Sequence, residues 1–301
     1  MSSKPSHKVL VICGPTATGK TALGVRLAKT FNGEIISADS RQVYKRMNAL
    51  TGKRDADPGV RVWLQDIVDP EEDFSIAKWR EMFWDAANQI WDNGKLPIAV
   101  GLTGFYLHAL TNQMETIDIP PNQQLRKELE EKTAKELGEL LKIKDSEKFD
   151  SMNTSDQQNP RRLIRAIEVA GQPRPRGTTQ QASYLFIGLN APTEILDKKI
   201  DQSIDERTKE ALEETKGLLA KNIVTSKQAL QTHGFRNLAP HIRGEITIED
   251  AVARWKTGEH QDARKQYSRL KKETDINWFD IAHKNFPKNV EELVASWYTR
   301  G

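Results

Sequence analysis

The chain has 301 residues, a formal net charge of +3, 37% apolar residues and 29% charged residues. This length is enough for one large globular domain, or for one such domain with a smaller insertion. Its apolar runs fall short of the roughly 18 residues of a membrane span, and the early run VLVIC is shorter than a secretory segment of about 7–15 residues. We therefore expect a cytoplasmic protein without membrane contact, and the single Cys13 excludes an intrachain disulfide.

The first third of the chain alternates strand-like and helical patterns. Apolar strand patterns occur at residues 8–13, 34–37, 60–65 and 97–100. Helical patterns lie near residues 20–30, 75–93 and 103–111, and Ser75 is placed to cap the second of them. Such alternation is typical of α/β proteins, in which a parallel sheet carries helices on both faces.

The pattern changes near residue 115. Two prolines precede a highly charged helical stretch, and the segment GQPRPRGTTQQ ends it. We interpret residues 115–181 as an inserted helical domain, within a core formed by residues 1–114 and 182–301. The core resumes with the strand SYLFIGL and is then mostly helical, apart from the late short strand INWFD.

A phosphate-binding loop is predicted directly after the first strand, where GPTATGKT fits the pattern GxxxxGK[ST]. In this pattern the glycines let backbone N–H groups point at a phosphate, and the following helix N-terminus adds its positive end. Lys20 supplies a charge, and the Thr21 hydroxyl suits Mg²⁺. The loop alone leaves the phosphate-bearing ligand open. Its predicted binding residues are Gly14, Pro15, Thr16, Ala17, Thr18, Gly19, Lys20 and Thr21.

A second candidate is Asp39, which follows the second strand in EIISADS. The strand at residues 97–100 leads instead into GLTG, so the aspartate usual for nucleotide hydrolysis is missing there. Loops at the carboxyl ends of neighbouring parallel strands converge, so Asp39 and Thr103 should face the phosphate loop. Asp39 suits either Mg²⁺ ligation or proton acceptance. Both residues are equally placed to cap the helical turns that follow them.

Two basic clusters are candidates for a polyanionic partner, although solvated helix faces are the alternative. The first contains Arg161, Arg162, Arg165, Arg174 and Arg176, with Glu168 as its acid. The second, residues 254–272, holds seven Lys and Arg against two acids.

Six motifs together resemble the tRNA dimethylallyltransferase (isopentenyl-tRNA transferase) family over nearly the whole chain. They are GPTATGKT, SADSRQVY, DPEEDFSIAKW, GLTGFYLHAL, NPRRLIRAIEV and WFD. The resemblance implies a P-loop NTPase-like core and transfer of a dimethylallyl group from dimethylallyl diphosphate. The acceptor would be the exocyclic amine of the adenosine 3′ of the tRNA anticodon, flipped out of its stack. We also expect a monomer, with Mg²⁺ as cofactor and Thr21 as its ligand.

The resemblance further assigns roles to residues of this chain. Asp39 would be the general base, and Thr103 would hydrogen-bond near the reacting centre. The loop would bind the diphosphate, and the inserted domain would hold the anticodon stem-loop. The residues expected to contact tRNA are Asp39, Ser40, Arg41, Gln42, Thr103, Arg126, Arg161, Arg162, Arg165, Gly234, Phe235 and Arg236.

The chain also departs from the family pattern. Leu102 stands where a glycine is usual, and Ser203 stands where an arginine near the pyrophosphate is expected, with Arg207 one helical turn away as a substitute. Two alternatives remain, namely a P-loop kinase that binds ATP and a small-molecule acceptor, and a tRNA-binding homologue with weakened catalysis.

Overall fold

The computed structural model describes residues 7–53, 57–101, 104–111, 116–117, 119–172, 182–221, 228–273 and 275–299. The chain divides into two compact units. The core unit consists of residues 1–110 and 180–301, and the helical unit consists of residues 111–179. No helix in the described ranges is long and apolar enough to cross a membrane.

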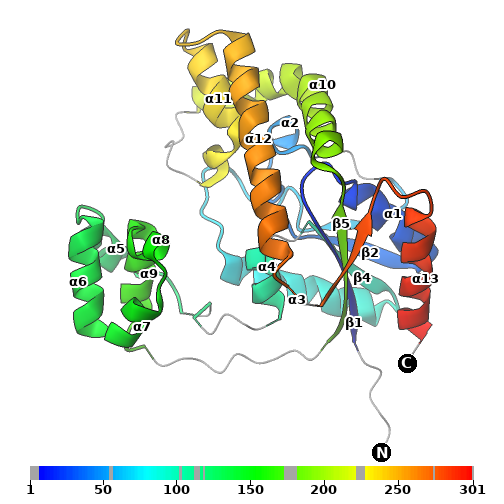
Figure 1. Cartoon of the computed structure of the whole chain (residues 1–301), viewed down its shortest axis with the longest axis horizontal. Coiled ribbons are helices and arrows are strands. Elements are labelled where there is room, and N and C mark those ends of the chain that lie inside the picture. The colour runs from blue at the N-terminus through cyan, green and yellow to red at the C-terminus, as the bar shows by residue number, and fades with distance from the viewer. Residues whose placement is uncertain are drawn as a thin grey trace, which may run out of the picture. The chain divides into compact units, whose positions relative to one another are not determined.

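The core unit contains a parallel sheet with strand order β3-β2-β4-β1-β5-β6, of which Figure 1 labels β1, β2, β4 and β5. The strands are β1 (Lys8–Cys13), β2 (Gly33–Ser37), β3 (Val62–Trp63), β4 (Leu96–Val100), β5 (Ser183–Asn190) and β6 (Ile276–Asp280). All five neighbouring pairs are parallel. The predicted α/β class is confirmed. Because β4 lies between β1 and β2, the loops that follow these three strands are neighbours.

The third strand is shorter than its apolar pattern at residues 60–65 predicts. β3 contains only Val62 and Trp63, which pair with Ile35 and Ile36 of β2. Leu64 and Asp66 have φ angles of 59° and 56°, in the left-handed region that ends an extended strand. The prediction over six residues is therefore wrong in length, and β3 is a short edge strand.

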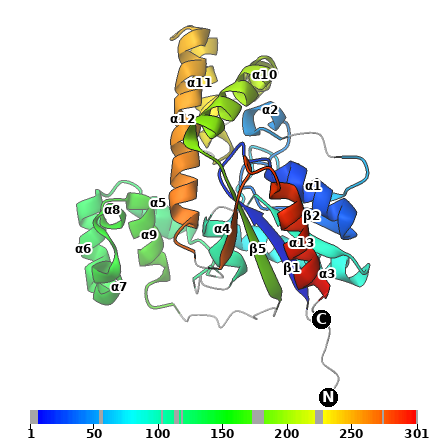
Figure 2. The same cartoon turned by 45° about the vertical axis from the view of Figure 1, so that its right-hand side comes forward.

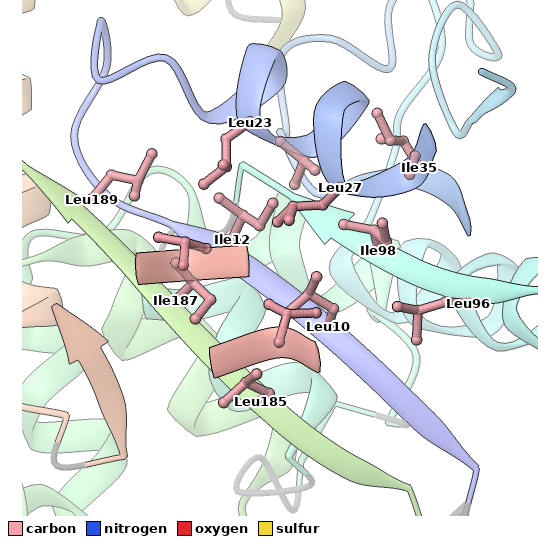
Figure 3. Packing of buried hydrophobic residues seen from close by; sticks show 14 of the residues in the cluster. Leu10, Ile12, Leu23, Leu27, Ile35, Leu96, Ile98, Leu185, Ile187 and Leu189 are labelled. Carbon is pink, nitrogen blue, oxygen red and sulfur yellow. The ribbon is translucent and has the colours of Figure 1, made fainter. Parts of the chain in front are cut away.

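Helices cover both faces of the sheet. On one face, Leu23 and Leu27 of α1 (Lys20–Thr30) pack on Leu10 and Ile12 of β1 (Figure 3), and α13 (Phe286–Thr299) adds Val290 to the same cluster. Side chains alternate along a strand, so the remaining β1 residues face the other side. There α3 (Ile76–Asp92) packs against β2 and β4, and α4 (Gly104–Leu110) packs on α3.

The predicted cap of α3 is confirmed. The Ser75 hydroxyl accepts a hydrogen bond from the Lys78 N–H at 3.2 Å. Farther along the helix, the Trp79 indole N–H donates to the Ser37 carbonyl at 3.1 Å. A buried indole that is satisfied in this way fixes the helix against the carboxyl end of β2, where the candidate site begins.

The C-terminal half of the core unit is mostly helical. It contains α10 (Thr193–Ala220), η1 (Gln228–Gln231), α11 (His233–Ile242) and α12 (Ile248–Leu270), and α10 also packs on α2 (Asn48–Thr51). Helices α10 and α12 lie side by side (Figure 2). Two ion pairs and one histidine–aspartate hydrogen bond, each one helical turn from the next, join them in antiparallel order. They are Asp197–Arg264 at 2.6 Å, Asp201–His260 at 2.9 Å and Asp205–Lys256 at 2.7 Å.

The helical unit is a set of short helices with polar caps. They are α5 (Gln123–Leu129), α6 (Ala134–Lys144), α7 (Ser146–Ser151), α8 (Thr154–Gln157) and α9 (Pro160–Val169). Their N-caps are Asn122, Thr133, Asp145, Asn153 and Asn159, and Thr133 forms a capping box with Glu136. Leucines of α5, α6 and α9 form its small core. The charged stretch therefore folds by frequent capping around few apolar residues.

A buried carboxylate organises the helical unit. The Glu168 side chain is 1% exposed, and Arg126 donates to both of its oxygens at 2.6 and 2.8 Å. Arg165 donates to the same carboxylate at 3.1 Å and to the carbonyls of Thr116 and Ile119 at 2.7 and 2.8 Å. Burial favours a higher pKa for Glu168, but the hydrogen bonds from Arg126 and Arg165 outweigh it and lower the pKa. This network ties the start of the unit to α9.

We expect Glu168→Gln to destabilise the helical unit, because two guanidinium groups lose their shared negative partner. Breaking a buried pair costs about 3–5 kcal/mol. The cost here should be smaller, since the Arg126 and Arg165 side chains are 37% and 31% exposed. Amide hydrogen exchange in α5 and α9 should become faster. The control is Glu139→Gln, an exposed change in α6. Equal acceleration in both variants would contradict the structural role of Glu168.

Candidate active site

The predicted phosphate loop connects β1 to α1 and is stabilised by its own side chains. The Thr18 hydroxyl donates to the Pro15 carbonyl at 2.8 Å, and Thr18 is 2% exposed. Ala17 and Gly19 have φ angles of 63° and 83°, which turn the backbone toward the start of α1. The loop therefore leads directly into the N-terminus of α1, and a loop followed by a helix N-terminus is an arrangement that binds phosphate.

Leu189 and Gln266, which are far from the loop in sequence, hold it in place. Gly14 has a φ of 137°, and a Cβ atom there would clash with the Leu189 backbone at the end of β5. The Gln266 side chain of α12 accepts a hydrogen bond from the Thr16 N–H at 3.1 Å. Sequence reasoning missed Gln266, because no local pattern links residues 250 positions apart. A glycine is required at position 14 because the backbone of β5 comes so close to it.

Lys20 is partly buried at the first position of α1, and its ammonium donates to the Pro15 carbonyl at 2.7 Å. Burial lowers its pKa to about 8, while the negative charge of Asp39 acts in the opposite direction. A lysine in this state gains from an added anion, which favours its charged form. The loop is therefore electrostatically suited to a phosphate ligand.

Asp39 lies beside the loop because of Gly101. The Gly101 N–H donates to the Ile12 carbonyl of β1 at 3.1 Å. A Cβ atom on Gly101 would lie 3.2–3.3 Å from the backbone of Ala38 and Asp39. The end of β4 thus contacts the ends of both β1 and β2. Asp39 is half-buried, and its Oδ1 accepts a hydrogen bond from the Arg41 N–H at 2.8 Å.

Tyr106 of α4 also belongs to this region, and sequence reasoning missed it. It is 5% exposed, and its ring packs edge-on against Trp79 with the centroids 4.3 Å apart. Burial raises the pKa of its phenol, and the negative charge of Asp39 adds to this effect. A neutral phenol therefore lies in electrostatic reach of Asp39. Its position within the helical pattern GFYLHAL was the available signal.

The oxygen donors near the loop suit Mg²⁺. Thr21 is exposed on the first turn of α1, and Asp39 Oδ2 has no hydrogen-bond partner among the described residues. The described ranges contain no cluster of three His, Cys, Asp or Glu side chains that fits a metal. Mg²⁺ usually binds one or two protein oxygens and completes its shell with substrate phosphates and water. These residues therefore fit a Mg²⁺ ion that is held chiefly by a bound diphosphate.

The remaining predicted contacts of the core unit differ in exposure. Ser40, Arg41 and Gln42 follow Asp39 and are half-buried. Gly234 and Phe235 of α11 are buried, with Gly234 against Leu50 and Trp255, whereas Arg236 is exposed. Leu102 and Thr103 lie outside the described residues, as do Arg174 and Arg176.

The arginines of the helical unit also separate into two groups. Arg126 and Arg165 are ion-paired to Glu168. Arg162 is exposed and pairs with Asp156, and Arg161 is exposed without an ion pair or hydrogen bond to another described residue. Arg161 and Arg162 therefore form the accessible part of the first basic cluster.

The expected substitute for an arginine at Ser203 is engaged elsewhere. Arg207 donates to the Ala49 carbonyl, and its guanidinium lies 4.7 Å from the centre of the Trp255 ring. It therefore holds α2 against α12. A different cation, Arg264, lines a cavity of about 360 Å³ at the carboxyl ends of β5 and β6, where it pairs with Asp197. In the second basic cluster, Arg264 and Lys256 are both neutralised by α10.

Comparison with known sequences identifies close relatives along nearly the whole chain. A family model described as IPP transferase matches residues 42–273, and one described as isopentenyl transferase matches residues 7–67. The tRNA dimethylallyltransferase of Bacillus cytotoxicus is 34% identical over 293 residues, which cover 93% of this chain and 92% of that protein. The enzyme of the same name from Thermoanaerobacter sp. is 35% identical over 304 residues, or 95% of each.

Solved structures agree with these matches. The tRNA isopentenylpyrophosphate transferase of Bacillus halodurans has a TM-score of 0.72 and 30% identity, with 96% of both chains covered. A eukaryotic dimethylallyltransferase acting on tRNA has a TM-score of 0.80 and 25% identity, with 96% of this chain and 78% of that chain covered. With a P-loop NTPase-like core and matches over more than nine-tenths of its length, the chain belongs to the IPP transferase family.

Proposed function

We propose that this chain transfers a dimethylallyl group from dimethylallyl diphosphate to the exocyclic amine of the adenosine 3′ of the anticodon in tRNA, and releases pyrophosphate. The observation that carries the proposal is the juxtaposition of the phosphate loop and Asp39 through Gly101, in a chain that matches tRNA dimethylallyltransferases. A diphosphate in the loop leaves the allylic carbon free to point toward the strand ends, where Asp39 lies.

In the proposed reaction, the adenosine amine attacks the allylic carbon, a C–N bond forms and the C–O bond to the diphosphate breaks. The bonding pair leaves with the diphosphate, and the amine proton passes to Asp39. Asp39 Oδ1 already accepts the Arg41 N–H, so Oδ2 is the oxygen available for this proton. Lys20 and the loop N–H groups stabilise the negative charge that develops on the leaving oxygen.

Mg²⁺ fits this site through Thr21, with the Asp39 carboxylate as a second oxygen in reach. When bound, it would supply Lewis-acid stabilisation to the diphosphate. Asp39 cannot use the same oxygen for the metal and for the proton. We therefore assign the metal contact to Thr21 and keep Asp39 as the base.

We place the tRNA contacts on the exposed cations of both units. Arg161 and Arg162 on α9 and Arg236 on α11 are the accessible members of the expected set. Ser40 and Gln42 lie next to Asp39 and would border the flipped adenosine. Arg126 and Arg165 support α9 from within, through Glu168. Gly234 and Phe235 support the start of α11 by packing.

The function test is transfer of label from radioactive dimethylallyl diphosphate into an unmodified tRNA transcript, with mass analysis of its nucleosides. We expect label in the adenosine 3′ of the anticodon and no release of label from γ-labelled ATP. In Asp39→Asn the proton acceptor is lost while the shape is kept, so transfer should fall by on the order of 10²–10⁴. Binding of donor and tRNA should change little.

Phosphate release from ATP would favour the kinase alternative. tRNA binding without transfer would favour the weakened homologue. Near-normal transfer by Asp39→Asn would contradict the role of Asp39 as base and would leave it a cap of the following turn.

Donor binding should depend on pH through Lys20. Its pKa is about 8 in the free protein, and a bound diphosphate raises it, so binding takes up a proton. The affinity for the donor is therefore highest below about pH 8. It falls as the pH rises through this value, by up to about tenfold per pH unit. Calorimetric titration with the donor between about pH 7 and pH 10 would measure this fall in affinity. In Lys20→Arg the cation stays charged, so affinity should be flat over this range. The same slope in both proteins would contradict the assignment.

Removing the exposed arginines of α9 should weaken tRNA binding electrostatically. Arg161→Ala combined with Arg162→Ala should reduce the slope of log affinity against log salt by about one to two units. Donor affinity should not change. The matched control is Lys135→Ala with Lys144→Ala, which removes the same charge from exposed positions of α6. If both pairs reduce the slope equally, net charge rather than an α9 contact explains the effect.

A further inference from the structure

Arg41 joins two distant parts of the core unit at the candidate site. Its backbone N–H donates to Asp39 Oδ1 at 2.8 Å. Its guanidinium Nη1 donates to the Gln228 carbonyl at 2.6 Å, and Gln228 stands 187 positions later, at the start of η1. One residue therefore contacts both the Asp39 carboxylate and the segment that leads into α11.

The charge of Arg41 also acts on the helices beyond η1. Asp262 of α12 accepts a hydrogen bond from the His233 ring at 2.9 Å, and this bond is the main cause of its lowered pKa. The positive charge of Arg41 contributes to the same shift. The guanidinium therefore lies in electrostatic reach of the pair that fastens the first residue of α11 to α12.

The environment of Arg41 differs from that of an exposed arginine that can bind a phosphate group. Arg161 and Arg236 are exposed, whereas Arg41 is half-buried and bonded to a neutral carbonyl. Holding a long side chain in one rotamer costs conformational entropy. A charged donor on a carbonyl gives a strong, directional bond. Such a bond fixes the distance between the loop after β2 and the start of η1.

We propose that Arg41 is a positioning residue for the transfer reaction. It holds the Asp39 carboxylate and the η1–α11 segment in fixed register, so that the flipped adenosine meets Asp39 Oδ2 at the right distance. This inference rests on the proposed function, in which Asp39 takes the amine proton. The bonds that form and break in the transfer reaction are unchanged, because Arg41 acts only through Asp39 and the η1–α11 segment.

Arg41→Met tests the proposal because it keeps an unbranched apolar stem and removes the guanidinium donor to the Gln228 carbonyl, while the backbone N–H to Asp39 stays. Misplacing a reacting group by about 1 Å costs on the order of 10²-fold in rate, so we expect a loss of about 10- to 100-fold in the single-turnover rate constant at saturating donor and tRNA. The dissociation constants of donor and tRNA should change by less than about threefold. Arg41→Lys should restore part of the rate, since an ammonium can still donate to the Gln228 carbonyl.

The matched control is Arg46→Met, which removes an exposed arginine of the same loop that pairs with Asp69 and Glu71. It should leave the rate constant unchanged. An equal loss in both variants would overturn the assignment to Arg41. Weaker tRNA binding with an unchanged rate constant would make Arg41 an RNA contact instead, and would also overturn the proposal.

Hydrogen exchange separates this proposal from the proposed function. In the protein without donor or tRNA, Arg41→Met should accelerate exchange at residues 41–44 and in the first turn of α11, and Arg46→Met should not accelerate it in α11. Unchanged exchange in α11 would overturn the role of Arg41 even if the enzyme is active. A natural protein that transfers no dimethylallyl group would overturn the proposed function, whatever the exchange shows.

Discussion

The backbone at the end of β4 touches the backbone at the end of β2 at Gly101, whose φ of 121° is one that residues with a side chain rarely adopt. A Cβ atom on Gly101 would come within 3.2–3.3 Å of Ala38 and Asp39. On the other side, Gly14 lets the end of β1 approach Leu189 of β5 more closely still, since a Cβ atom there would lie 2.3 Å from the Leu189 carbonyl oxygen. Together the two glycines pack four strand ends at backbone distance. A phosphate loop and a carboxylate that are far apart in sequence thereby share one small space, as chemistry on a diphosphate requires.

The parts of this arrangement that were predictable are those with a local pattern. The α/β class follows from alternating apolar segments, and the phosphate loop follows from eight consecutive residues. The position of Asp39 follows from its place after a strand. Gln266 carries no such pattern, because its hydrogen bond to Thr16 exists only after α12 has packed. The early end of β3 depends on positive φ angles at Leu64 and Asp66, and leucine rarely adopts such an angle.

Charge in this chain has two uses that composition cannot distinguish. Some cations are neutralised internally, such as Arg126 and Arg165 by Glu168, and Lys256 and Arg264 by aspartates of α10. Others, such as Arg161 and Arg236, stay exposed. The first group holds helices in place and the second is available to a polyanion. The folded structure therefore separates the cations of one sequence cluster into those that pair with an acidic side chain and those that stay exposed.

The pairing of β1 with β5 spans the entire helical unit, from Lys8–Ser183 to Cys13–Gly188. During synthesis the phosphate loop is made before its support at Leu189, which follows about 170 residues later, and before Gln266, which follows later still. At roughly 5–20 residues per second, the loop waits many seconds for these partners. The helical unit, whose contacts join residues close in sequence, has no such delay. Residues 14–21 are thus made well before the partners that complete their surroundings, and during that interval the apolar strand β1 has no β5 to pair with.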